Sequence, residues 1–414
     1  MNLPKYSMGV GDRFFHEAEA QLTAFFKLKE AGVEAAPVWN KSNREHEIIG
    51  TNPDSVRLKA DEAVNKLNWP GAYFVDADHI GLNTVDKFLT SSDFYTLDVA
   101  DFIGNAASEA DVKTFVEKYK KYAGKLVLPV SNKEINITEE QIEEAAKKYL
   151  YAIQEAGKIY RHIEAKKGAG NFVTEVSSDE TETPQTPVEL LFILAAIAEE
   201  KIPAQTIAPK FTGRFNKGID YVGNLAQFES EFNDDLAVIK FAIKEFGLPE
   251  NLKLSIHSGS DKFSIYPIMK KAIRLFDAGI HLKTAGTTWL EEAAGLALSG
   301  GTALELIKEI YANAYDRYDE MCKPYLTVID IDTNRLPSPA EVSTWDGVKF
   351  ANALRHNQAN PEYNINLRQL IHVGYKVAAE KGETFTNELV VNRAKISELV
   401  TENIFENHMK PLFL

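Results

Sequence analysis

Short apolar segments alternate with helical segments along most of the chain, and this alternation constrains the fold more than any other feature. Eight segments are predicted to be strands: 34–40, 71–78, 94–101, 171–178, 204–211, 252–259, 279–286 and 326–332. Near-continuous apolar runs are typical of strands in a parallel sheet that is covered on both faces. Eight strand–helix units favour an α/β fold of the (β/α)8 TIM-like barrel type over an open doubly wound sheet. Residues 7–14 are a possible ninth strand, which would displace one of the eight.

Three helices carry recognisable start signals. Capping boxes at Thr138 and Thr186 predict helices over about 140–165 and 187–201, the second with Pro187 at its first position. A similar motif at Thr288 predicts a helix over 288–298. The residues after about 340 are also mainly helical in pattern. We therefore expect a barrel domain at 1–340 and a helical C-terminal extension at 341–414 that packs on it.

The composition limits the class of protein. The 414 residues are 44% hydrophobic, which is enough for a large core, and the net charge of -14 argues against a nucleic-acid partner. The single cysteine, Cys322, suits a reducing cytosol. The longest apolar run, 190–198, is too short to span a bilayer. We expect a cytoplasmic protein with a small-molecule substrate, no nucleic-acid or membrane partner, and a possible homo-oligomeric state.

Polar or ionisable residues stand at the carboxyl end of every predicted strand. They are Asn40, Lys41, Asp78, His79, Asp98, Asp101, Glu175, Lys210, His257, Lys283, Asp330 and Asp332. One such residue alone is more often a helix cap or a core histidine. Eight such ends together match the catalytic face of a barrel. Imidazoles with carboxylates suit an open site for zinc, nickel, manganese or iron.

Two further features concern the ligand. Lys210 and Lys283 could bind an anionic substrate, or one of them could form a Schiff base. Gly259 and Gly286 follow two strand ends and precede helices, so backbone N–H groups can approach a ligand closely there. These loops fit a polyhydroxylated acid or a sugar phosphate. Neither a G-x-G-x-x-G motif between strand and helix nor a G-x-x-x-x-G-K-[ST] motif occurs, so the sequence gives no support to a dinucleotide or nucleoside-triphosphate site.

Seven stretches in order resemble the tagaturonate epimerase family: PVWNKSNREHEIIG, YFVDADHIGLNTVDKF, TEVSSDETETPQTPVELL, QTIAPKFTGRFNKGIDYVGN, KLSIHSGSDKFSIYP, HLKTAGTTWLEE and LRQLIHVGYK. The resemblance extends from about residue 7 to residue 414. The family interconverts D-tagaturonate and D-fructuronate, and some members also epimerise tagatose and fructose. Its fold is similar to that of metal-dependent (β/α)8 barrels.

The resemblance implies a role for each matching residue. Asp78 would be the general base and Glu175 the proton donor. His79 and His257 would bind a divalent metal, which we expect to be zinc, nickel or manganese. The third ligand would be Asp220, with His281 as the alternative. Adjacent strand residues point to opposite faces, so Asp78 and His79 can share a site only where the strand gives way to loop.

The chemistry of the two sugars is consistent with this set of groups. Taken as 2-ketoses with a terminal carboxylate, they differ only at C4, which is β to the ketone and is not inverted by enolisation. A retro-aldol route inverts it: a base removes the C4 hydroxyl proton, the C3–C4 bond breaks, the metal holds the enediolate, and the aldehyde rotates before the bond re-forms. Lys210 or Lys283 would pair with the substrate carboxylate. The alternatives are a class II aldolase-like lyase acting on a sugar acid or sugar phosphate, and a non-catalytic sugar-acid-binding protein.

Overall fold

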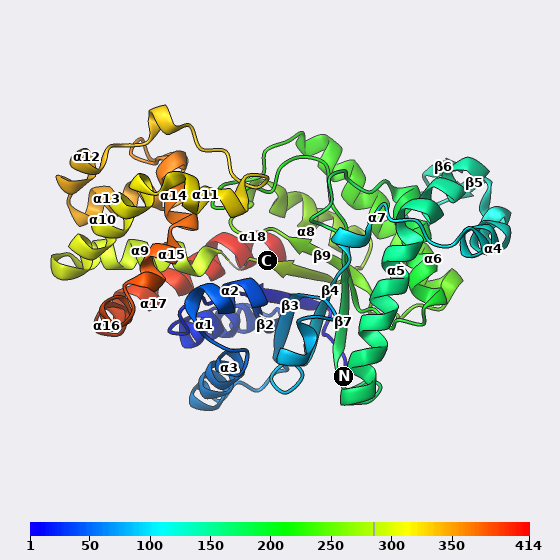
Figure 1. Cartoon of the computed structure of the whole chain (residues 1–414), viewed down its shortest axis with the longest axis horizontal. Coiled ribbons are helices and arrows are strands. Elements are labelled where there is room, and N and C mark those ends of the chain that lie inside the picture. The colour runs from blue at the N-terminus through cyan, green and yellow to red at the C-terminus, as the bar shows by residue number, and fades with distance from the viewer. Residues whose placement is uncertain (285) are drawn as a thin grey trace.

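The structure is a computed structural model that describes residues 1–284 and 286–414. Its centre is a closed barrel of parallel strands in the order β1, β10, β9, β8, β7, β4, β3, β2 (Figure 1). The strands are β1 (Tyr6–Val10), β2 (Ala36–Ser42), β3 (Phe74–Ile80), β4 (Phe94–Asp98), β7 (Val173–Ser177), β8 (Thr206–Ala208), β9 (Lys253–His257) and β10 (Ile280–Lys283). The predicted (β/α)8 TIM-like barrel is confirmed.

One of the eight predicted strands is wrong. Residues 326–332 form no strand, and β1, from the alternative segment 7–14, pairs with both β2 and β10 to close the barrel. The segment 326–332 instead bonds to α14 (Ile365–Val373), where the Gln369 side chain accepts from the Asp330 backbone N–H at 2.8 Å. A segment with an apolar pattern can join the barrel only if a neighbouring strand has an unpaired edge. The edges of β2 and β10 are already paired with β1. Ala285, in the predicted strand 279–286, lies outside the described residues.

Helices connect the strands and cover the barrel. They are α1 (Ala18–Glu30), α2 (Asn43–Ile49), α3 (Asp54–Leu67), α4 (Glu109–Tyr119), α5 (Glu139–Lys167), α6 (Pro187–Glu199), α7 (Leu225–Phe246), α8 (Tyr266–Leu275) and α9 (Thr287–Ser299). Both capping boxes, at Thr138 and Thr186, are present. The predicted cap at Thr288 is wrong, because α9 already begins at Thr287 and the Thr288 hydroxyl accepts a hydrogen bond from the Gln21 side chain at 2.9 Å.

The rest of the chain is helical and packs on one side of the barrel (Figure 1). Its helices are α10 (Gly301–Asp316), α11 (Tyr318–Cys322), α12 (Pro339–Ser343), α13 (Gly347–Leu354), α14, α15 (Tyr375–Glu380), α16 (Glu383–Val391), α17 (Arg393–Glu402) and α18 (Lys410–Phe413), with a π-helical turn at Asn403–Met409. α17 packs against α1 and α9, and α18 packs against α8. The helical tail is confirmed, whereas the domain boundary at 340 stays a prediction, since helix already follows helix from α9 onward.

A small hairpin of β5 (Gly124–Val127) and β6 (Glu134–Ile137) lies beside α4 at the opposite edge of the molecule (Figure 1).

In the part of the chain that the structure describes, every helix is too short or too polar to span a bilayer.

The barrel interior changes from apolar to polar along the strands. One cluster of buried apolar side chains comes from the start of the strands: Leu3, Ala36, Val38, Phe74, Phe94 and Val173. Two positions further along β3, β4 and β7 stand Asp76, Thr96 and Glu175, each of them buried. Side chains two apart on a strand share a face, so the strand pleat brings these polar groups to the carboxyl end of the barrel. That end carries the active site in barrel enzymes.

Candidate active site at the carboxyl ends of the strands

Lys283, at the end of β10, lies among three carboxylates. Its ammonium is 2.8 Å from Asp76, 2.8 Å from Asp78 and 3.0 Å from Glu175. Burial alone would lower the pKa of Lys283, but the carboxylates raise it well above its ordinary value. Lys283 is therefore a charged group that the protein itself already pairs. This position does not favour an ion pair between Lys283 and a substrate carboxylate, because the ammonium is already paired. It does not favour a Schiff base either, because that reaction requires a neutral amine.

Asp78 and His79 share the site because β3 is irregular at this point. The pairing of β3 with β4 shifts between Ala77 and Ile80, which leaves one extra residue on β3. His79 has a φ of 51°, in the left-handed region that non-glycine residues seldom adopt. Both side chains consequently line the same cavity. The two neighbours share the site through a bulge within β3, which continues to Ile80, and not because the strand gives way to loop as the sequence suggested.

The two carboxylates of β3 differ in protonation. Burial alone would raise the pKa of Asp78, but Lys283 and His79 bring it below its ordinary range. Burial raises the pKa of Asp76 to about 7 in spite of Lys283. Asp78 lines the cavity, so it is the ionised carboxylate available to accept a proton from a bound substrate.

Each active-site histidine is held through one ring nitrogen by a carboxylate. Nδ1 of His79 is 3.2 Å from Asp98, and Nε2 of His257 is 2.8 Å from Glu175. The two rings are nearly perpendicular, with centroids 5.3 Å apart. A carboxylate on one nitrogen fixes the ring and leaves the other nitrogen for a metal ion.

The two histidines lie close to a further carboxylate, Asp179. Ligand atoms of His79, Asp179 and His257 all lie within 4.8 Å of one another. Nδ1 of His257 is 3.1 Å from Asp179. Two ligands at right angles on one ion, each about 2.1 Å from it, would be about 3.0 Å apart. The spacing of His257 and Asp179 therefore fits a shared cation.

The charge balance also fits a cation. Five carboxylates surround the one ammonium of Lys283 and the two imidazoles: Asp76, Asp78, Asp98, Glu175 and Asp179. Because five carboxylates outnumber the three groups that can carry positive charge, a divalent ion would stabilise this arrangement. Imidazole and carboxylate are the ligands that zinc, nickel and manganese accept.

The predicted third ligands lie elsewhere. Asp220 accepts hydrogen bonds from the backbone and the side chain of Ser264, at 3.1 and 3.0 Å. His281 is fully buried, its Nδ1 is 2.9 Å from the Ser7 hydroxyl, and burial lowers its pKa to about 3. Asp220 as a ligand, or His281 in its place, stays a prediction that this geometry does not favour; the geometry favours Asp179.

A cavity of about 860 Å³ opens above these groups, and a smaller one of about 300 Å³ adjoins it. Both are lined by Asp78, His79, Arg44, Lys217 and Gly259. Lys210 lines the larger cavity, as predicted for a substrate-binding residue, although its ammonium donates to the backbone carbonyl of Thr181. The cavity therefore joins an acidic reaction centre to a set of cations.

Sequence reasoning missed three residues of this site. Asp179 belongs to the acidic loop 177–187, and its place four residues after Glu175 was the available signal. Arg44 and Lys217 lie within the stretches that resemble the family. Candidate residues were chosen at the carboxyl ends of predicted strands, and neither residue lies at such an end.

The chain is similar to proteins of known function over most of its length. The model of the tagaturonate epimerase family matches residues 1–412. A tagaturonate/fructuronate epimerase of Thermotoga maritima is 32% identical over 383 residues, which cover 89% of this chain and 72% of that protein.

Two crystal structures of a fructuronate-tagaturonate epimerase from Cohnella laeviribosi share the fold. The glycerol complex has a TM-score of 0.81 at 24% identity and covers 100% of this chain and 82% of that one. The native structure has a TM-score of 0.78 at 24% identity, with 98% and 81% covered. The match to the family model over almost the whole chain shows that this protein belongs to the tagaturonate epimerase family and is a carbohydrate epimerase.

Proposed function

We propose that the protein interconverts D-tagaturonate and D-fructuronate at C4 with the help of a divalent cation. The observation that carries this proposal is the convergence of His79, His257 and Asp179 beside the ionised Asp78 in one cavity. The neutral pair D-tagatose and D-fructose differs at the same carbon and is a possible second substrate class.

His79, His257 and Asp179 would hold the cation, and Asp98 and Glu175 would orient the two imidazoles. When bound, a zinc, nickel or manganese ion supplies a Lewis acid that stabilises negative charge on the substrate oxygens at C2 and C3.

Asp78 would start the reaction by taking the proton of the C4 hydroxyl. The C4–O bond then becomes a carbonyl, and the electrons of the C3–C4 bond move to C3, in conjugation with the C2 carbonyl. Rotation about C4–C5 turns the other face of the aldehyde towards C3. Re-formation of the C3–C4 bond gives the inverted alcohol once a proton returns to its oxygen.

Glu175 has two possible roles in this scheme. The resemblance assigns it the return of the proton. Its carboxylate is fully buried and bonded to His257 and Lys283, so direct exchange with a substrate requires one of these side chains to move. The position of Glu175 favours the role of holding His257, and the two roles predict different effects of Glu175→Gln on metal binding.

Product chromatography tests the proposed function. Protein loaded separately with zinc, nickel and manganese is incubated with D-tagaturonate and with D-fructuronate, and a chelator-treated sample is run in parallel. Each sugar should yield the other, and the chelator should abolish the conversion. Accumulation of three-carbon fragments would indicate a lyase, and an unchanged substrate would indicate a binding protein.

A further inference from the structure

Lys217 is a cation of the cavity that pairs with no carboxylate in the part of the chain that the structure describes. Six cationic side chains line the two hollows: Arg13, Arg44, Lys210, Arg214, Lys217 and Lys283. Arg13 pairs with Glu45 at 3.1 Å, and Arg214 pairs with Asp330 at 2.9 Å. Within residues 1–284 and 286–414, no carboxylate pairs with Lys217 or Arg44. Of these two, Lys217 is half-buried and Arg44 is exposed, so Lys217 is the better shielded from water.

The loop that carries Lys217 is held by two buried cations. The ammonium of Lys262 donates to the carbonyls of Asn216 and Ile219, at 3.0 and 2.7 Å. Arg368 of α14 donates through Nε to the carbonyl of Gly218. The backbone N–H of Lys217 itself donates to Val328 at 2.7 Å. These hydrogen bonds therefore fix the backbone on both sides of Lys217. They do not involve the Lys217 side chain, which lines the cavity.

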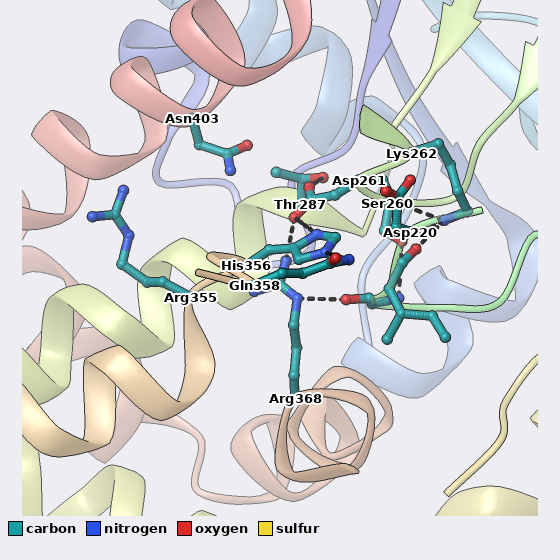
Figure 2. A network of polar contacts seen from close by, with 12 residues as sticks. Asp220, Ser260, Asp261, Lys262, Thr287, Arg355, His356, Gln358, Arg368 and Asn403 are labelled. Atoms are coloured by element: carbon teal, nitrogen blue, oxygen red, sulfur yellow. Dashed lines mark hydrogen bonds and ion pairs between the residues drawn. The ribbon is translucent and has the colours of Figure 1, made fainter. Parts of the chain in front are cut away.

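Asp261 ties this loop to the C-terminal helices. Arg368 is 2.5 Å from Asp261, which is also 3.2 Å from His356 (Figure 2). Asp261 also lies 3.1 Å from His408. Figure 2 shows Lys262 and Arg368 approaching the same loop from different elements. Because the members of this network are buried, Lys217 is presented by a rigid support and not by a free surface loop.

The side chain of Lys217 reaches back to the end of β9. A Cβ added to Gly259 would lie 3.2 Å from the Lys217 ammonium. Gly259 follows His257 by two residues and has a φ of 65°, which favours glycine. Because Gly259 has no side chain, the Lys217 ammonium has room to lie next to this residue, close to His257. The N-terminal end of α9, at Gly286, lines the same smaller hollow and adds positive potential.

We propose that Lys217 binds the carboxylate of the substrate and so selects uronates over neutral ketoses. This inference rests on the proposed function. The carboxylates around Lys283 would repel a second anion, whereas Lys217 offers an unpaired ammonium in the same cavity. Cleavage between C3 and C4 leaves the carboxylate on the aldehyde fragment. A carboxylate held by Lys217 keeps that fragment in place while it rotates, which distinguishes an epimerase from a lyase.

The test compares Lys217→Met with the control Lys271→Met, since Lys271 lies on α8, lines neither hollow and is already paired with Glu229. For each protein, KM and kcat are measured with D-tagaturonate, and D-tagatose is titrated as a competing neutral sugar. Lys217→Met should lower kcat/KM for D-tagaturonate roughly 10- to 100-fold, as expected for loss of a hydrogen bond between charged groups. Its inhibition constant for D-tagatose and the kinetics of Lys271→Met should stay near those of the unaltered protein, and Lys217→Arg should restore part of the loss.

An unchanged KM for D-tagaturonate in Lys217→Met, or an equal weakening of D-tagatose binding, would overturn the assignment of Lys217 while leaving the proposed function intact. Absence of D-tagaturonate turnover in the unaltered, metal-loaded protein would overturn both.

Discussion

Nδ1 of His257 lies 3.1 Å from a carboxylate oxygen of Asp179. A ligand atom of His79 lies within 4.8 Å of both, a spacing at which the three side chains could share one cation. This relationship is the reason for proposing Asp179 as the third ligand.

We expect Asp179→Asn to lose metal and Asp220→Asn to keep it. Loss of a ligand should weaken zinc affinity more than about 100-fold, since loss of a group that only orients a ligand already costs about 10- to 100-fold. Metal content after dialysis, measured by elemental analysis, distinguishes the two variants. A metal-free Asp220→Asn beside a metal-replete Asp179→Asn would restore the ligand set predicted from the sequence.

The carboxylates behind the histidines should affect metal binding without touching the ion. Asp98→Asn and Glu175→Gln are each expected to lower zinc affinity about 10- to 100-fold, because they orient His79 and His257. A competition titration with a chromophoric chelator measures this directly. If Glu175→Gln binds zinc normally and loses only turnover, Glu175 is the proton donor that the resemblance implies.

Asp78→Asn should have the opposite pattern. The amide keeps the shape of the carboxylate but cannot accept the proton of the C4 hydroxyl, so turnover should fall about 10²- to 10⁴-fold with the metal retained. Asp101→Asn is the matched control, since Asp101 also follows a barrel strand but is exposed. Full turnover in a metal-loaded Asp78→Asn would remove Asp78 from the role of base.

Glu17 gives a prediction about stability and pH. Burial, with Asp12 nearby, raises the pKa of Glu17 from 4.5 to about 8. Between these two values the unfolded chain binds fewer protons than the folded one, so stability falls as the pH rises. Glu17→Gln removes this term and should stabilise the protein by up to about 3 kcal/mol at pH 7, with little effect near pH 4.

Thermal unfolding at pH 4, 7 and 8 checks this expectation. The control is Glu19→Gln, because Lys66 and Arg393 lower the pKa of Glu19 in spite of its partial burial. That variant should lose stability at pH 7 relative to pH 4. A Glu17→Gln variant that is destabilised equally at every pH would contradict the assignment of a neutral Glu17.

Much of the barrel and part of the site could be predicted from the sequence. Asp78, Glu175, His257 and Lys283 end predicted strands, and their inward direction follows from the pleat. Asp179 could not be predicted in this way, because it stands in the loop after β7, whose path no periodicity encodes. The charged partners of Lys283 also depend on the register of three strands, which the sequence of one strand does not specify.

The mistaken strand at 326–332 has a related cause. Its apolar pattern is similar to that of the barrel strands. Whether a segment joins the barrel also depends on an unpaired strand edge, and β1 already pairs with the edges of β2 and β10. Similarly, Lys217 depends on Arg368, which is 151 residues away in the chain, for the position of its loop. Local sequence does not record such long-range contacts.

The retention of the C4 hydrogen tests the account most directly. Metal-loaded protein is incubated with D-tagaturonate in D2O, and the D-fructuronate formed is analysed by NMR. Retro-aldol cleavage leaves the C4 hydrogen on the aldehyde carbon throughout, so the product should carry protium at C4 and no free fragments should accumulate. Deuterium at C4 would contradict cleavage between C3 and C4, and with it the role that we give to Asp78.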